Sequence, residues 1–79
     1  MKATISNVNI RGCEQKTGKG GEYLLVRFED EGGAPHELVD KNMDRQSYYT
    51  RDTQGSLTIN IEIGAKWTNI RIVDFIIDR

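Results

Sequence analysis

The sequence has few of the residues on which disulfide-bonded and metal-bound folds depend. Its 79 residues include one cysteine, one histidine and one proline. The single cysteine, Cys13, excludes an internal disulfide and a cysteine-rich zinc site. A chain of this length has room for one small core. We therefore expect a single domain over residues 1–79 that holds no metal or cofactor.

Long apolar runs are also absent. Hydrophobic residues make up 37% of the chain, and no run is long enough to cross a bilayer. The first ten residues mix Lys2, Ser6 and Asn7 with apolar residues, which is not the pattern of a signal peptide. These absences predict a soluble protein without a membrane partner, and the cytoplasm is the expected compartment.

No group of residues has the pattern of a catalytic site. A nucleophile with a base and an orienting residue cannot be identified, and His36 lies among acidic residues, where a surface histidine is expected. The GKGG stretch at residues 18–21 lacks the first glycine and the following helix of a phosphate-binding P-loop. We therefore expect a binding protein and not an enzyme.

Positive and negative residues are separated along the chain, although the formal net charge is only −1. Positive residues outnumber negative ones between residues 11 and 27, and negative residues dominate between residues 29 and 44. This separation predicts a basic side and an acidic back. Chance variation on a solvated surface is the alternative.

Alternating apolar and polar residues predict two strands in the second half of the chain. In the stretch 55–64 every second residue is apolar, which is the period of a strand with one buried face; the apolar residues are Leu57, Ile59, Ile61 and Ile63. A second strand, predicted over residues 70–77, follows after a short break, so the two are expected to pair antiparallel. This last strand has Ile70, Ile72 and Ile76 on one side and Val73, Phe75 and Ile77 on the other. Two apolar sides predict a homodimer formed through this strand.

Three further strands are predicted in the first half. The segment 2–13 changes its apolar phase between Ile5 and Val8, which predicts a bulge. The segment 22–30 alternates, with a core face that consists of Leu24, Val26 and Phe28. A third strand is predicted over residues 36–40, and the polar, glycine-containing segments 14–21 and 31–35 are predicted to be a hairpin loop and a turn.

A short helix is predicted between the third and fourth strands. Asn42 is a good N-cap, and the residues after it suit about two helical turns. Strand, strand, strand, helix, strand, strand is the order of the OB-fold, a five-stranded Greek-key barrel whose ligand face uses strands two and three. An SH3-like barrel is the main alternative. The expected fold is therefore mainly β, with one short helix between strands three and four.

Two stretches resemble small OB-fold single-stranded DNA-binding proteins of bacteriophages and conjugative elements. Residues 16–28, KTGKGGEYLLVRF, are similar to the basic glycine loop that leads into an aromatic-bearing strand in that family. Residues 67–75, WTNIRIVDF, are similar to its closing strand. The resemblance implies a non-catalytic protein that binds single-stranded DNA largely independently of sequence during phage or mobile-element replication, with RNA as the other candidate ligand.

The expected site combines cations for phosphates with flat side chains for base stacking. On an OB-fold, the loops at 14–21 and 64–68 would flank the outer face of the second strand. The residues assigned to nucleic-acid binding are Lys16, Lys19, Tyr23, Arg27, Tyr49, Lys66 and Trp67. Trp67 is either a stacking residue or part of the core. Tyr48 and Tyr49 adjoin, so both cannot face the core.

A protein-interaction barrel, such as a phage accessory or inhibitor protein, is the alternative function. On that reading, a contact patch of Tyr23, Leu25 and Phe75 would meet a protein partner. Binding of oligo-dT would favour the first function, and stoichiometric capture of one protein without nucleic acid would favour the second.

Overall fold

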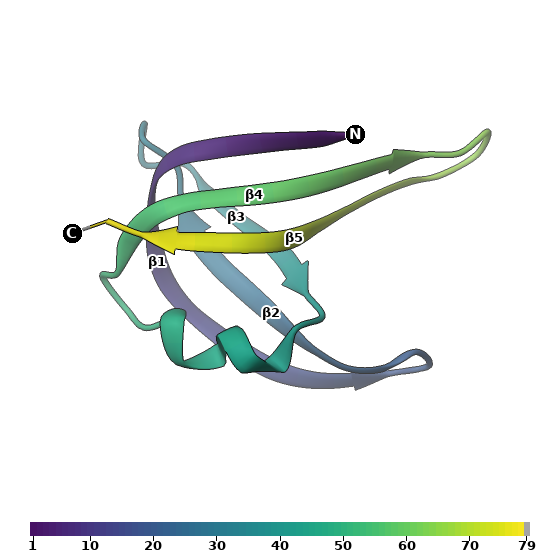
Figure 1. Ribbon diagram of the computed structural model, residues 1–79, viewed down its shortest axis with the longest axis horizontal. Helices are drawn as coiled ribbons and strands as arrows, with labels where there is room; N and C mark the ends of the chain where they lie inside the picture. Colours follow the sequence, from purple (N-terminus) through teal and green to yellow (C-terminus); the bar gives the residue numbers. More distant parts are fainter. Residues whose placement is uncertain (79) are drawn as a thin grey trace.

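The computed structural model describes residues 1–78 and contains five strands and one short helix (Figure 1). The elements are β1 (Lys2–Gly18), β2 (Gly21–Glu29), β3 (Pro35–Asp40), η1 (Met43–Tyr48), β4 (Gln54–Ile63) and β5 (Thr68–Ile77). The strands close a barrel in the order β1-β2-β3-β5-β4, in which β3 and β5 pair parallel and the other neighbours pair antiparallel. This order, with the helix between β3 and β4, confirms the OB-type barrel predicted from the sequence.

Strand β1 is bent and pairs with two different strands of the barrel. Its first part pairs with β4 and its second part with β2. The register shifts between Ile5 and Val8, where Asn7 has a φ of 57°, and again between Ile10 and Gly12. The phase change seen in the sequence is therefore a real irregularity. It lets Val8 and Ile10 enter the core with exposed fractions of 1% and 0%.

The core is apolar and lies between β2 and the β4–β5 pair. Its buried members are Val8, Ile10, Leu24, Val26, Phe28, Tyr49, Leu57, Ile59, Ile72 and Phe75. The predicted core face of β2 is confirmed, because Leu24, Val26 and Phe28 are all buried. The predicted burial of one face of β4 is confirmed only within the barrel, because Ile63 on that face is 70% exposed. Beyond the barrel, β4 and β5 continue as a projecting hairpin (Figure 1).

Strand β5 contains a bulge that corrects the expectation of two buried sides. Thr58 pairs with Asp74 and Ile59 with Ile72, so one extra residue, Val73, is inserted between the two pairs. Because of this insertion Ile72 and Phe75 both face the core, although their spacing had placed them on opposite sides. The two apolar phases of β5 therefore come from one inner face that changes register.

The expected loop at residues 14–21 is mostly strand. β1 runs on to Gly18 and β2 begins at Gly21, and Lys16 pairs with Tyr23 in the ladder between them. The segment lacks apolar residues because it projects beyond the core, so neither of its faces is buried. A two-residue turn, Lys19 and Gly20, joins the strands, and backbone pairing alone continues the hairpin.

The helix η1 begins as the sequence predicts. The Asn42 side chain accepts a hydrogen bond of 3.0 Å from the backbone N–H of Asp44 and so caps the first turn. The helix is a six-residue 3-10 helix with no fully buried residue. A helix this short gains little from its own hydrogen bonds, so its position depends on contacts with the barrel.

Those contacts converge on Asp40, whose side chain is fully buried at the end of β3. Its carboxylate accepts hydrogen bonds from Arg45 Nε at 2.6 Å, Arg45 Nη2 at 3.2 Å, the Tyr49 hydroxyl at 2.5 Å and the Asn42 backbone N–H at 2.9 Å. A buried carboxylate is tolerated only with such partners. The Tyr49 ring also stacks on Phe75 with centroids 5.3 Å apart, which ties the end of η1 to β5.

We predict that Asp40→Asn lowers the free energy of unfolding by about 3 kcal/mol, because Arg45 and Tyr49 lose their charged acceptor. Tyr49→Phe removes one hydrogen bond and keeps the ring, so a loss of about 1.5 kcal/mol is expected. Urea denaturation measures both values. Asp44→Asn, at an exposed position of the same helix, is the control and should change little. A stability of Asp40→Asn equal to that of the control would contradict this role.

Gly55 of β4 is predicted to tolerate no side chain. A Cβ atom there would collide with the backbone oxygen of Ile76 and lie 2.8 Å from the Phe75 ring. Gly55→Ala should therefore cost about 2–3 kcal/mol, measured by thermal unfolding. Gly20→Ala is the matched control, since nothing lies within 4 Å of a Cβ at that position. Equal melting temperatures for the two variants would contradict this prediction, because they would show that β5 can move away from β4.

Candidate nucleic-acid interface

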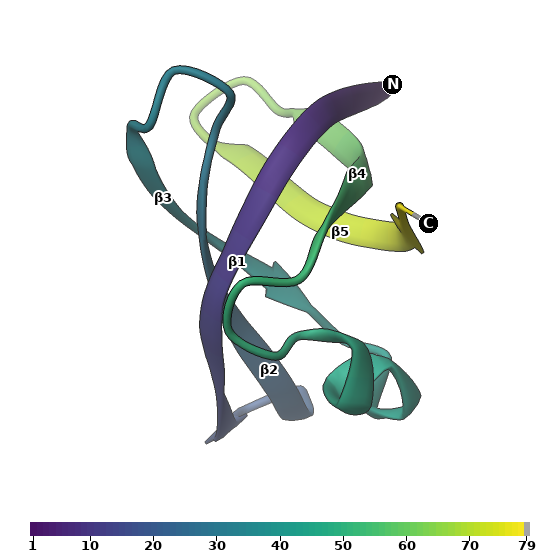
Figure 2. The same ribbon diagram turned by 90° about the vertical axis from the view of Figure 1, so that its left-hand side faces the viewer.

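Two hairpins project from the same side of the barrel (Figures 1 and 2). The first arm is the β1–β2 hairpin around Lys19 and Gly20, and the second arm is the β4–β5 hairpin around residues 64–67. In the strand order β1-β2-β3-β5-β4, β3 lies between β2 of the first arm and β5 of the second. The two arms therefore flank the outer surface of β2 and β3, which is where OB-folds bind their ligands.

The strand register determines which side chains share this outer surface, which we call the ligand face. Leu25 of β2 lies opposite Glu14 of β1 and Val39 of β3, and Val39 lies opposite Arg71 of β5. Directly paired residues point to the same side of a sheet. Leu25 and Val39 are both partly exposed, so the middle of the ligand face is apolar and charged residues surround it.

A groove of about 290 Å³ lies at one end of the ligand face, next to the first arm. We call it the Tyr23 groove; the side chains in its lining are those of Lys19, Glu22, Tyr23, Val39, Lys41, Asn69 and Arg71. Tyr23 is half-buried. A Cβ on Gly18 would lie 3.2 Å from Tyr23 Cε1, so the glycine lets the ring lie close to the neighbouring strand.

Three cations line the Tyr23 groove, and two of them form no ion pair within residues 1–78. Lys19 and Lys41 are exposed, and neither forms an ion pair within residues 1–78. Arg71 contacts Glu62 at 3.4 Å. The sequence pattern predicted Lys19 as a binding residue, but not Lys41 or Arg71. Lys41 was hidden in an acid-rich segment, and its position two residues after Val39 on an outward-facing phase was the signal that could have revealed it.

Lys16 and Arg27 lie on the ligand face, but both form ion pairs with carboxylates. Glu14 contacts Lys16 Nζ at 3.3 Å and Arg27 Nη2 at 3.3 Å, and Glu37 contacts Arg27 Nε at 3.2 Å. Hydrogen bonds from Lys16 and Arg27 lower the pKa of Glu14, and those to Glu37 and Glu14 raise the pKa of Arg27. Glu37 belongs to the acid-rich segment, so that segment does not lie wholly on the back of the protein.

Tyr49 was assigned to the ligand, and its position rules this out. The residue is 2% exposed, and its hydroxyl donates to Asp40. Burial, followed by the hydrogen bond to Asp40, strongly raises the pKa of Tyr49. Tyr48 is 45% exposed, so the two tyrosines do face different ways as expected. Tyr49 cannot stack on a base, because its ring is packed in the core against Phe75.

Trp67 and Lys66 lie at the tip of the second arm. Trp67 is 56% exposed, which decides against a core position. Its indole lies over Gly64, where a Cβ would come within 2.5 Å of Nε1, and the Gly64 N–H donates to the Trp67 carbonyl at 2.8 Å. Lys66 is exposed. Neither residue lines the Tyr23 groove, so the arm presents a separate aromatic and cationic surface.

Phe75, one of three residues in the alternative protein-contact patch, is buried at 5% exposure. It cannot meet a partner beside Tyr23 and Leu25. The alternation of apolar residues in β5 had predicted an accessible Phe75, because the bulge at Val73 is not visible in the sequence.

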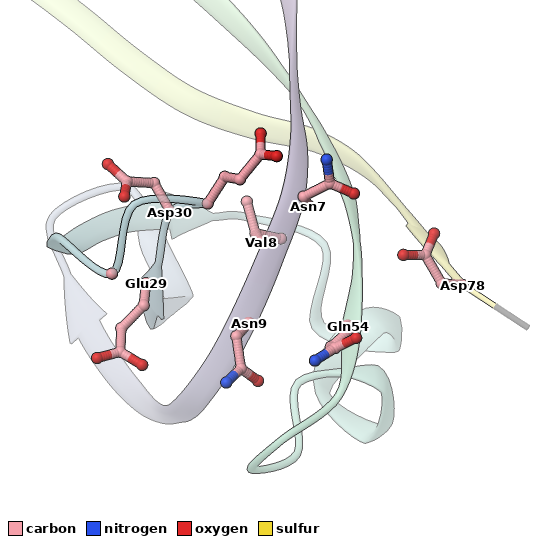
Figure 3. Close-up of a pocket in the computed structure, with 9 residues that line it drawn as sticks. Asn7, Val8, Asn9, Glu29, Asp30, Gln54 and Asp78 are labelled. Atoms are coloured by element: carbon pink, nitrogen blue, oxygen red, sulfur yellow. The ribbon is translucent and has the colours of Figure 1, made fainter.

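The opposite end of β2 carries an acidic hollow of about 330 Å³ (Figure 3). Its acidic lining residues are Glu29, Asp30, Glu31 and Asp78. The side chains of Glu29, Asp30 and Asp78 point apart. No group of three or more His, Cys, Asp or Glu side chains within residues 1–78 could hold a metal ion. Nearby His36 is exposed and bonded to Asp30 at 2.9 Å, as expected for a surface histidine, and this bond lowers the pKa of Asp30.

The structure also bears on the membrane question. Within residues 1–78, no helix has the length and apolar character needed to cross a bilayer.

Comparison with known proteins assigns no family to the chain. No family model matches it, and no curated protein and no solved structure matches it significantly.

Proposed function

We propose that this protein binds single-stranded nucleic acid, DNA in the first place, without catalysis and largely independently of sequence. One observation carries the proposal: half-buried Tyr23 lines a groove of the ligand face together with Lys19 and Lys41, two exposed cations that form no ion pair within residues 1–78. The resemblance of two stretches to phage and conjugative-element proteins suggests DNA replication in the cytoplasm as the setting.

The groove offers both kinds of contact that a single strand requires. A base can stack on an aromatic ring, at about 1–3 kcal/mol per base, while long cationic side chains follow the phosphates. Lys19 comes from the two-residue turn of the first arm, and Lys41 directly follows β3. Cations from two separate elements can contact phosphates on both sides of one stacked nucleotide, and no base edge has to be read.

The second arm extends this surface. Trp67 exposes most of its indole, and Lys66 precedes it. Indole is a large stacking surface, so Trp67 supplies a second platform for a base beyond the Tyr23 groove. Both arms lie on the same side of the barrel (Figure 1), which allows one strand of nucleic acid to contact them both.

A homodimer through β5 is part of the proposal. The bulge accounts for the two apolar phases of this strand, and several large apolar residues of the β4–β5 hairpin nevertheless remain exposed. Apart from Trp67, these are Ile63 at 70%, Ile70 at 38%, Ile76 at 62% and Ile77 at 39%. Exposed apolar residues in this number on one hairpin are typical of an interaction surface. The same residues favour the second candidate function, in which a different protein covers this hairpin.

We predict that Tyr23→Ala weakens binding to labelled oligo-dT by about 1–3 kcal/mol, since it removes the stacking ring. Tyr48→Ala, which removes an exposed tyrosine outside the groove, should bind like the unmodified protein. Fluorescence anisotropy measures both, with rU and duplex oligonucleotides as further ligands. Absence of binding to oligo-dT and rU at low salt would contradict the function, and equal binding to duplex would contradict the preference for single strands.

Lys41→Ala should weaken binding and make it less dependent on salt. Each phosphate contact adds about 0.7 to the slope of log affinity against log salt for a single strand, so the slope should fall by about that amount. Arg51→Ala, at an exposed cation outside the groove, should leave the slope unchanged. Identical slopes for the two variants would remove Lys41 from the site.

Ile76→Lys should convert the proposed dimer to a monomer, because a buried apolar contact would become a charge without a partner. Gln15→Lys, on the exposed first arm, is the control and should remain dimeric. Sedimentation velocity at micromolar concentration measures the mass of both. A monomer in the unmodified protein would contradict dimerisation and leave the proposed nucleic-acid site intact.

A further inference from the structure

A carboxylate occupies the middle of the ligand face, between two of its cations. Glu14 Oε2 lies 3.3 Å from Lys16 Nζ, and Glu14 Oε1 lies 3.3 Å from Arg27 Nη2. Both cations have the position and charge to contact phosphate, and both contact the carboxylate instead. A negative group at this point opposes the binding of a polyanion, so the arrangement requires an explanation.

The register of β1 and β2 places Glu14 there. Residues 12, 14 and 16 alternate along β1 and point to the same side, opposite Arg27, Leu25 and Tyr23 of β2. Gly12 has no side chain, and the space where its Cβ would lie is empty to 4 Å. Arg27 is therefore free to extend along the face to Glu14, two residues further along β1.

The ion pairs contribute little to the stability of the fold. The side chains of Glu14, Lys16 and Arg27 are 49%, 44% and 43% exposed. Exposed pairs of this kind typically contribute little to folding stability. Their effect on a charged ligand is larger, because a phosphate can replace the carboxylate only if it overcomes the repulsion from the displaced Glu14.

We propose that Glu14 limits the nucleic-acid site by competing with phosphate for Lys16 and Arg27. This inference rests on the proposed function, since it concerns the same ligand face. The carboxylate competes with phosphate at Lys16, opposite Tyr23, and at Arg27 further along the face, and it leaves Lys19 and Lys41, which are unpaired within residues 1–78, as the cations of the Tyr23 groove that phosphate can reach. The affinity is moderate because Lys16 and Arg27 are already neutralised.

The two cations are held differently, and this difference gives the proposal a specific test. Lys16 is held by Glu14 alone, whereas Arg27 is held by Glu14 and also by Glu37, which lies 3.2 Å from Nε. Replacing Glu14 therefore frees Lys16 and leaves Arg27 paired. Replacing Glu37 frees neither cation, and only the double replacement frees both.

The test compares Glu14→Gln, Glu37→Gln and the double variant with the unmodified full chain, by titration of labelled oligo-dT over a series of salt concentrations. For Glu14→Gln we expect tighter binding at low salt and a slope of log affinity against log salt that is steeper by about 0.7. For Glu37→Gln the slope should not change. For the double variant the slope should be steeper by about 1.4, and the number of nucleotides covered per protomer should increase.

Glu37→Gln is the matched control, because it removes the same charge from the same face. Slopes that rise equally in the two single variants would show a general effect of net charge and overturn the proposal. Unchanged slopes in all three variants, with oligo-dT still bound, would also overturn it and leave the proposed function standing. Failure of the unmodified protein and all variants to bind oligo-dT would instead remove the proposed function, and this inference with it. Circular dichroism should show the same melting temperature for all four proteins.

Discussion

The buried carboxylate of Asp40 is the interaction on which the arrangement of this barrel depends. It closes the end of β3, caps the chain at Asn42, and holds Arg45 and Tyr49 of the connecting segment in place. Tyr49 in turn stacks on Phe75, so the helix, β3 and β5 share one contact. Because Asp40 points into the core, its neighbours Val39 and Lys41 point outward in the alternation of the strand. The core contact thereby places Lys41 in the Tyr23 groove.

Irregularities in the strands give the barrel its closure and its functional surface. The two register shifts in β1 let one strand pair with both β4 and β2, and the bulge at Val73 directs Ile72 and Phe75 inward together. Both hairpins extend beyond the core, where backbone hydrogen bonds continue without apolar burial. These extensions create the two arms, and the ligand face between them exists because the strands are longer than the core requires.

The positions of individual charged residues matter more on this protein than its net charge. The net charge of −1 gives no overall attraction to a polyanion, so affinity must come from the few cations that are both exposed and unpaired. Within residues 1–78, Lys19 and Lys41 in the Tyr23 groove meet that description, while Lys16, opposite Tyr23, and Arg27, further along the face, are paired with Glu14 and Glu37. On the proposed function, a near-neutral protein of this kind would bind through a few local cations, and the balance between carboxylate and phosphate would determine how far the site extends.

The sequence by itself determined the strand order, the core face of β2, the N-cap at Asn42 and therefore the fold class, because alternation and capping are local properties of the chain. It also predicted Lys19 and Tyr23 as binding residues, and the structure places both in one groove. Only the tertiary structure decided that residues 14–18 are strand, that Val73 forms a bulge, and that Tyr49 faces the core while Tyr48 does not. It also revealed that Glu14 holds Lys16 and Arg27. The reason is physical: a residue pattern gives the period of a strand, whereas a register shift or an ion pair depends on partners that are distant in the sequence.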